Sequence, residues 1–130
     1  MKSLITGGTG FLGSELARVL VARGDEVILF DIAPNVGKLG RIAESVSLAQ
    51  GNLVNASELH NVVKDTRPDC IFHLASMLSV PSNQNPWSAL QINVMGTENV
   101  LEAARLFDVP RVIFTSTVAT YGIGSGRTVT

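Results

Sequence analysis

The chain has little cysteine, little charge of either sign and few aromatic side chains. Cys70 is its only cysteine, so no disulfide can form within the chain, and a reducing, cytoplasmic setting is favoured. The net charge is −1 at pH 7, which provides neither a basic surface for nucleic acid nor a polybasic anchor for a membrane. His, Cys, Asp and Glu do not cluster at the spacing of metal ligands, so no metal site is expected.

A long uninterrupted apolar run is also missing. Charged side chains at Glu15, Arg18 and Arg23 break the apolar N-terminal stretch, which excludes a membrane-spanning helix there and argues against a signal peptide. The first expected strand begins at residue 2 and leaves no room for a presequence. Hydrophobic residues make up 45% of the chain and charged residues 16%, as in a compact domain with a sizeable core.

The chain does have a regular alternation of expected strands and helices. Apolar runs bounded by turn residues predict strands at 2–6, 26–31, 46–49, 70–74 and 111–116. Apolar residues at helical spacing predict helices at 11–23, 55–66 and 86–107. Strands joined by helical crossovers form a parallel sheet with helices on both faces. We therefore expect a doubly wound, three-layer α/β fold with five strands, in one domain over residues 1–130.

Each expected helix has an apolar face and recognisable end signals. Gly24 is placed to end the first helix, and Asn55 with Glu58 resembles a capping box at the start of the second. The first helix is expected to bury Leu12, Leu16, Val19 and Leu20, and the second to bury Leu59, Val62 and Val63. The third helix aligns Leu90, Val94, Thr97, Leu101 and Ala104 on one face.

The turn after the first strand has Gly7, Gly10 and Gly13 at intervals of three. Glycine has no Cβ, so the chain can turn tightly and a ligand can approach the main-chain amides. Unpaired amides at the start of the next helix, at the positive end of its dipole, favour a bound anion such as a pyrophosphate. Spaced glycines alone also fit a structural turn, but the order strand, glycines, helix, strand and acid favours dinucleotide binding.

Asp31 is the acid in that order, at the end of the second expected strand. Its carboxylate can accept hydrogen bonds from ribose hydroxyls and would repel a 2′-phosphate, which predicts NAD rather than NADP. An ordinary surface acid is the alternative. Lys38 and Arg41 lie nearby in sequence and could bind a phosphate, which leaves NADP open. ATP is not expected, because Ser14 occupies the position where triphosphate-binding loops have lysine.

Motifs along nearly the whole chain resemble a known family. They are Thr6–Gly13, Gly51–Leu53, His73–Ser76, Asn93–Thr97 and Thr115–Gly122. As a set they are similar to the extended short-chain dehydrogenase/reductase family, in its NAD-dependent epimerase/dehydratase group. The resemblance implies a Rossmann fold, NAD as cofactor and hydride transfer at a hydroxyl of a sugar, most often a nucleotide sugar. The alternatives are an NAD-dependent dehydrogenase of a non-sugar alcohol or hydroxy acid, and a non-catalytic dinucleotide-binding redox sensor.

The resemblance also implies roles for single residues. Phe11 and Leu12 would offer main-chain amides to the pyrophosphate, and Thr117 would place its hydroxyl on the substrate oxygen. Asn52, where the family usually has Asp, would flank the adenine. The residues implied to bind the cofactor are Gly7, Gly10, Phe11, Leu12, Gly13, Asp31, Asn52, Leu53, Leu74, Ala75, Ser76, Asn93 and Thr115.

Several of these residues have a plainer alternative. His73 at a strand end is expected to be a hydrogen-bonded structural histidine rather than a base, and Cys70 is expected in the core. Asn93 fits a tie between the long helix and a neighbouring loop as well as a cofactor contact. Thr117 also fits an ordinary hydroxyl after a strand, and Tyr121 is expected to pack rather than to catalyse.

The catalytic Tyr-x-x-x-Lys pair that the resemblance implies does not occur within residues 1–130. We therefore expect a dinucleotide-binding domain truncated before the helix that carries this pair and before the C-terminal substrate lobe. Such a chain would bind NAD but would be inactive alone. Its fifth strand would be a sheet edge and its long helix would lose a packing neighbour, so self-association as a homodimer is expected.

Overall fold

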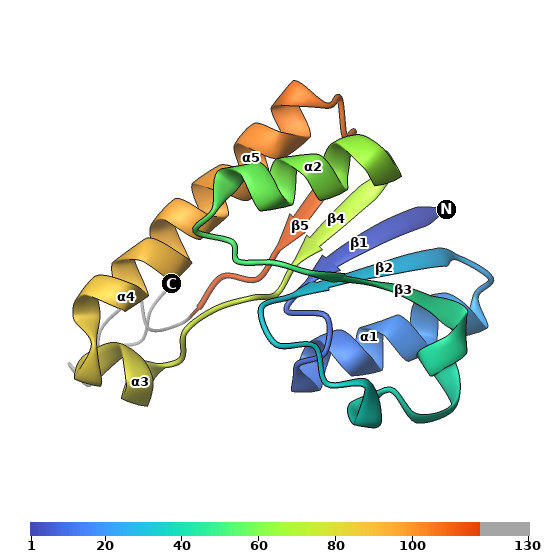
Figure 1. Cartoon of the computed structure of the whole chain (residues 1–130), viewed down its shortest axis with the longest axis horizontal. Helices are drawn as coiled ribbons and strands as arrows, with labels where there is room; N and C mark the ends of the chain where they lie inside the picture. Colours follow the sequence, from blue (N-terminus) through green and yellow to red (C-terminus); the bar gives the residue numbers. More distant parts are fainter. Residues whose placement is uncertain (118–130) are drawn as a thin grey trace, which may run out of the picture.

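The computed structural model describes residues 1–117, which form a parallel sheet covered by helices on both faces (Figure 1). The strands stand in the order β3-β2-β1-β4-β5, and all four neighbouring pairs are parallel. Their bounds are β1 Lys2–Thr6, β2 Glu26–Asp31, β3 Val46–Gln50, β4 Cys70–His73 and β5 Val112–Phe114. The chain runs outward from β1 to β3, returns across the sheet and continues outward from β4 to β5. The predicted five-stranded, doubly wound fold is confirmed.

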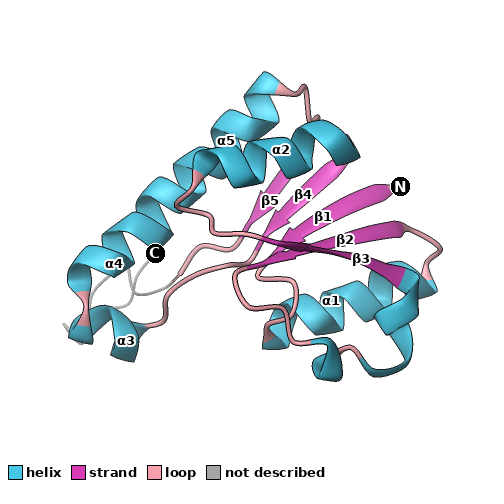
Figure 2. Cartoon of the chain, in the orientation of Figure 1, coloured by secondary structure: helices cyan, strands magenta, loops and turns pink. Residues whose placement is uncertain are grey.

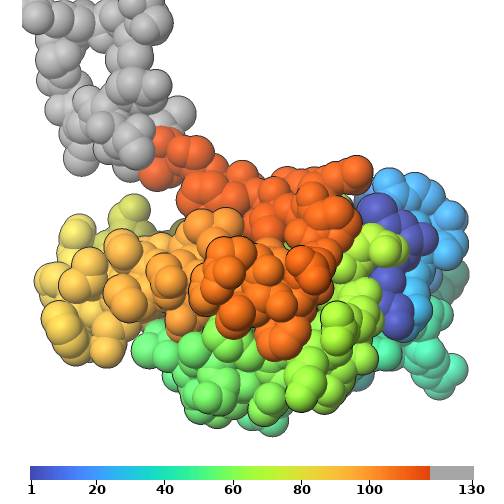
Figure 3. All heavy atoms as spheres, turned by 90° about the horizontal axis from the view of Figure 1, so that it is seen from above, coloured from blue at the N-terminus to red at the C-terminus, as the bar shows by residue number. Residues whose placement is uncertain are grey.

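Helices make up the two outer layers (Figure 2). One face carries α1 (Phe11–Ala22) with the short 3-10 helices η1 (Val36–Lys38) and η2 (Gly40–Ser45), and the other carries α2 (Ala56–Thr66) and α5 (Gly96–Leu106). Figure 3, which looks at the second face, shows α2 and α5 lying side by side. The sheet is therefore the middle layer of three.

Successive strand residues point to opposite faces of the sheet and build two cores. Leu4 of β1 and Ile28 of β2 pack with the side chains of α2 and α5, whereas the next residues, Ile5 and Leu29, pack with α1. All four are almost fully buried. Because β1 is covered on both faces and paired on both sides, the turn that follows it is held in a fixed position.

The expected inner face of α1 is wrong in part. Leu12 and Val19 are 55% and 64% exposed, whereas the buried residues of α1 are Gly13, Ser14, Ala17 and Leu20. The helix begins directly after the glycine turn and must approach the sheet closely there, which requires small side chains inward. Gly13, Ala17 and Leu20 follow helical spacing as well as the larger residues do, so the turn and not apolarity decides which face is buried.

The expected long helix contains three segments: α4 (Pro86–Leu90), a π-helical segment η3 (Gln91–Met95) and α5. The preceding stretch, for which the sequence predicted neither a helix nor a strand, forms the short helix α3 (Ser79–Gln84). Of the single face aligned from the sequence, Leu90, Val94 and Leu101 are exposed, as expected where no described residue covers them, but Ala104 is buried, so the expected alignment is wrong in part. The buried side of α5 consists of Gly96, Val100, Ala103 and Ala104.

Candidate functional site

The turn between β1 and α1 lies so close to its neighbours that only small residues fit. Gly7 has a left-handed φ of +66°, and a Cβ there would lie 2.9 Å from the Cα of Ala75. A Cβ on Gly8 would lie 2.6 Å from the Cβ of Leu29, and one on Gly13 would overlap the carbonyl oxygen of Gly7. The turn is therefore wedged between β2 and the segment that follows β4.

A cavity of about 210 Å³ opens beside this turn, where the strand order reverses; we name it the first cavity. Its lining residues are Gly7, Phe30, Asp31, Ile32, Gly51, Asn52, Leu53, Ala75, Ser76 and Ile92. Most of them follow the carboxyl ends of β1, β2, β3 and β4. Of the residues predicted to bind the cofactor, this cavity brings together Gly7, Asp31, Asn52, Leu53, Ala75 and Ser76.

Asp31 is held by three hydrogen bonds at the end of β2. Its Oδ2 accepts from the main-chain N of Thr9 at 3.0 Å and from the Oγ1 of Thr9 at 2.7 Å, while its Oδ1 accepts from the N of Ala33 at 3.2 Å. The carboxylate is only partly buried and lines the first cavity. It is thus a fixed acceptor facing that space. Sequence reasoning missed Thr9, whose only signal is a hydroxyl residue between the glycines.

Asn52 lies in a short loop after β3 whose conformation depends on Glu58. The Asn52 main-chain N donates to Oε2 of Glu58 at 2.7 Å, and the Asn52 Oδ1 accepts from the N of Val54 at 3.0 Å. Asn55 precedes α2 as expected, but its side chain accepts no capping bond; its Nδ2 donates to Oε1 of Glu58 at 2.7 Å. Glu58 therefore orders the loop rather than forming the expected capping box.

A larger hollow of about 570 Å³, the second cavity, lies beyond β4 and β5. Its lining residues are His73, Leu74, Ala75, Ser76, Met77, Leu78, Ser79, Ser82, Asn83, Asn93, Thr97, Phe114, Thr115, Ser116 and Thr117. The structure places here the predicted residues Leu74, Asn93, Thr115 and Thr117. Ala75 and Ser76 line both cavities, so the segment after β4 forms a wall shared between them.

Asn93 ties the long helix to that shared wall. Its Oδ1 accepts from the main-chain N of Met77 at 2.7 Å, and its Nδ2 donates to the main-chain O of Met77 at 3.0 Å. This pair of bonds confirms the structural alternative for Asn93. Since Asn93 also lines the second cavity, a contact with a cofactor stays a prediction.

His73 and Cys70 have the structural environments that the sequence predicts. His73 is 3% exposed, and its Nδ1 lies 2.7 Å from Thr6 Oγ1 while its Nε2 lies 3.0 Å from Thr97 Oγ1. Burial lowers the pKa of His73, and its ring stacks on Phe114 with centroids 6.0 Å apart. Cys70 is fully buried, and burial raises the pKa of its thiol. His73 is thus a neutral, hydrogen-bonded group and not an exposed base.

The remaining residues predicted to contact a pyrophosphate lie at the start of α1. Gly10 precedes the helix and donates from its main-chain N to the O of Gly7 at 3.0 Å, while Phe11 and Leu12 have exposed side chains. These residues do not line either cavity. Their amides belong to the first turn of a helix, and the binding of an anion there stays a prediction.

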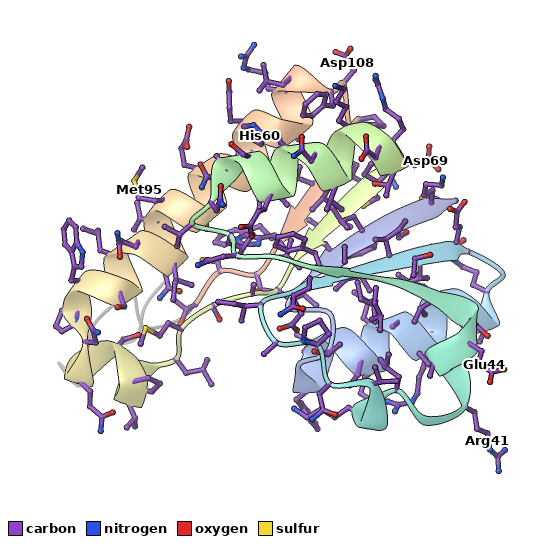
Figure 4. The ribbon with its side chains drawn as sticks, viewed as in Figure 1. Arg41, Glu44, His60, Asp69, Met95 and Asp108 are labelled. Atoms are coloured by element: carbon purple, nitrogen blue, oxygen red, sulfur yellow. The ribbon has the colours of Figure 1, made fainter. Side chains whose placement is uncertain are left out.

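The cations considered for a phosphate do not line the two cavities. Lys38 lies in η1, where its carbonyl oxygen accepts from Arg18, and Arg41 points away from the molecule (Figure 4). In residues 1–117, no group of three or more His, Cys, Asp or Glu could hold a metal ion. The helices described over the same range are all too short or too polar to cross a bilayer.

The sheet order, the glycine turn and the acid at the end of β2 define a dinucleotide-binding type of α/β domain. Comparison with known proteins identifies its family: the profile of the NAD dependent epimerase/dehydratase family matches residues 3–129. The chain belongs to this family.

Relatives in this family include named epimerases. CDP-paratose 2-epimerase of Salmonella typhi is 36% identical over 94% of this chain, and UDP-glucose 4-epimerase of Lactobacillus helveticus is 31% identical over 95%. The crystal structure of Thermus thermophilus UDP-glucose 4-epimerase in complex with NAD superposes with a TM-score of 0.82 and 31% identity over 90% of this chain. This chain spans 38%, 37% and 38% of the lengths of these three proteins.

Proposed function

We propose that this chain is the cofactor-binding part of an NAD-dependent epimerase/dehydratase that transfers a hydride at a hydroxyl of a nucleotide sugar. The observation that carries the proposal is the first cavity, which joins the glycine turn, the Asp31 carboxylate and the segments after β3 and β4. Relatives named as epimerases of CDP-paratose and UDP-glucose, and a neighbour solved with NAD, support this assignment.

The described residues fit the adenosine half of NAD. A ribose needs a fixed acceptor, which Asp31 provides, and a pyrophosphate needs close main-chain contact, which the wedged glycine turn permits. Asn52 and Leu53 would flank the adenine in the first cavity. We do not assign a basic residue to a 2′-phosphate, since Lys38 and Arg41 lie outside that lining, so NAD rather than NADP is the proposed cofactor.

The second cavity would receive the nicotinamide end and the sugar. NAD, when bound, supplies the acceptor for a hydride. Asn93 and the Ala75–Ser76 wall would position the ring, and the hydroxyl of Thr117 would hydrogen-bond the reacting oxygen of the substrate. We infer that the chain alone is inactive, because the Tyr-x-x-x-Lys pair that would remove the proton does not occur in its sequence. A cytoplasmic homodimer remains part of the proposal.

Calorimetric titration with NAD, NADH, NADP and ADP-ribose tests the binding step. We expect NAD and ADP-ribose to bind and NADP to bind more weakly. Asp31→Asn should weaken NAD binding by about 10-fold or more, since a hydrogen bond to a charged group contributes about 1.5–3 kcal/mol. Glu44→Gln, an exposed acid on η2, is the matched control and should change nothing (Figure 4). No heat with any nucleotide from the folded wild-type chain would refute the proposal.

A second candidate function is a dehydrogenase of a non-sugar alcohol. The human short-chain dehydrogenase/reductase family 42E member 1 is also 36% identical, over 88% of this chain and 28% of its own length. The name of this relative specifies a dehydrogenase/reductase and no sugar, so the similarity supports a dehydrogenase as a second candidate. Screening the parent enzyme for reduction of NAD by non-sugar alcohols, against epimerisation of nucleotide sugars, distinguishes the two functions.

A further inference from the structure

The contact between Thr9 and Asp31 joins the glycine turn to the acid at the end of β2. Both the main-chain N and the Oγ1 of Thr9 donate to the same carboxylate oxygen, at 3.0 and 2.7 Å. Thr9 is 3% exposed, so water does not compete for these bonds. A further bond from the N of Gly8 to the O of Phe30, at 3.3 Å, holds the same two segments together. The acid therefore cannot turn without breaking contacts to the glycine turn.

The two oxygens of the Asp31 carboxylate are used unequally. Each carboxylate oxygen can accept about two hydrogen bonds. Oδ2 receives both of its bonds from Thr9, whereas among the described residues Oδ1 receives one, from the N of Ala33 at 3.2 Å. The remaining capacity of this carboxylate to accept a hydrogen bond is therefore on Oδ1.

We propose that Thr9 determines cofactor specificity together with Asp31. By holding one carboxylate oxygen, Thr9 leaves the other to accept a ribose hydroxyl and keeps the negative charge where a 2′-phosphate would meet it. Without the Thr9 hydroxyl, Oδ2 keeps only the bond from the main-chain N of Thr9, so the acid would be held less firmly against a phosphate and discrimination against NADP would fall. This inference deepens the proposed function and rests on the proposed binding of NAD.

Calorimetric titration of Thr9→Val and Thr9→Ser with NAD and NADP tests the inference. Thr9→Val keeps the shape of the side chain and removes the hydroxyl, so we expect about 10-fold weaker NAD binding and a ratio of the two affinities about 10-fold closer to one. Thr9→Ser restores the hydroxyl and should keep the wild-type ratio. If Thr9→Val weakens the binding of both nucleotides equally, or of neither, the inference is wrong, because a purely structural role would not change the ratio of the two affinities.

A double-mutant cycle provides a second, independent test. In an Asp31→Ala background, Thr9→Val should have no further effect on NAD affinity, because the oxygen that Thr9 holds is gone. If the effects of the two substitutions on NAD affinity are additive, the inference is wrong. Circular dichroism checks that each variant folds, and Thr9→Ala replaces the valine variant if the latter does not. Failure of the wild-type chain to bind NAD would instead refute the proposed function, and this is known before any variant is made.

Discussion

The hydrogen bonds around His73 fix the position of its proton. Thr97 Oγ1 donates to the main-chain O of Asn93 at 2.8 Å, so its oxygen is left to accept from the His73 ring. The ring proton must then be on Nε2, and Nδ1 must accept from Thr6 Oγ1 at 2.7 Å. Thr6 Oγ1 in turn accepts from the N of Ala75 at 3.4 Å. We therefore predict a neutral His73 with its proton on Nε2.

Replacing Thr97 with valine tests this chain of bonds. The substitution keeps the side-chain shape but leaves the buried Nε2–H of His73 without its acceptor. An unsatisfied buried donor lowers the free energy of unfolding by about 1–3 kcal/mol. In a domain of this size, each kcal/mol lowers the melting temperature by about 4 °C, so we expect a decrease of about 4–12 °C. Thr97→Ser keeps the hydroxyl and serves as the matched control.

Urea denaturation of the wild type, Thr97→Val and Thr97→Ser measures the differences in their free energies of unfolding, and ¹⁵N NMR of the His73 ring identifies its tautomer. We expect the serine variant to lie close to the wild type and the valine variant to be clearly less stable. A ring proton found on Nδ1, or valine and serine variants of equal stability, would refute the reasoning, since both outcomes require a different direction for these hydrogen bonds.

Three further predictions concern acid stability, the glycine turn and assembly. Because burial lowers the pKa of His73 below its ordinary 6.5, the unfolded chain takes up a proton first as the pH falls. As the pH falls below about 6.5, the free energy of unfolding should decrease, with at most about 1.4 kcal/mol per pH unit from this group, and above that pH it should stay level. Urea denaturation of the wild type and of His73→Gln across this pH range measures the slope, which the variant should lack. Gly8→Ala should lower the free energy of unfolding by about 1–3 kcal/mol through overlap with β2, whereas Gly37→Ala should not. The proposed homodimer should sediment as a monomer when Leu101→Glu places a charge on the exposed apolar face.

The sequence predicted most of the fold because the relevant signals are local. Continuous apolar runs separate buried strands from amphipathic helices within a few residues, and the crossover rule then sets the parallel sheet. The position of Asp31 at the end of β2 followed from the same reading, since only the order of strand, glycines, helix and strand is needed. The helix α3 was missed because it has no apolar periodicity to distinguish it from a loop.

What the sequence did not predict depends on residues that are distant along the chain. Thr6 and His73 are separated by 67 positions, and Thr9 and Asp31 by 22, so their hydrogen bonds exist only once the strands are paired. The inward face of α1 was misassigned for a similar reason. Close approach to the glycine turn selects Gly13 over Leu12, and this contact is not visible in the periodicity of the helix alone.

The central position of β1 explains why these distant residues meet at one place. β1 pairs with β2 on one side and with β4 on the other, so the residues that follow the three strands share one edge of the sheet. Thr6 at its end bonds His73 and also accepts directly from the main-chain N of Ala75, and Thr9 just beyond holds Asp31. One short stretch of chain thus fixes the wall shared by both cavities and the acid of the first. A dinucleotide lying along this edge would meet Asp31 and the Ala75 segment, both held by residues in or just after β1, so a change at Thr6 should disturb the wall that the two cavities share.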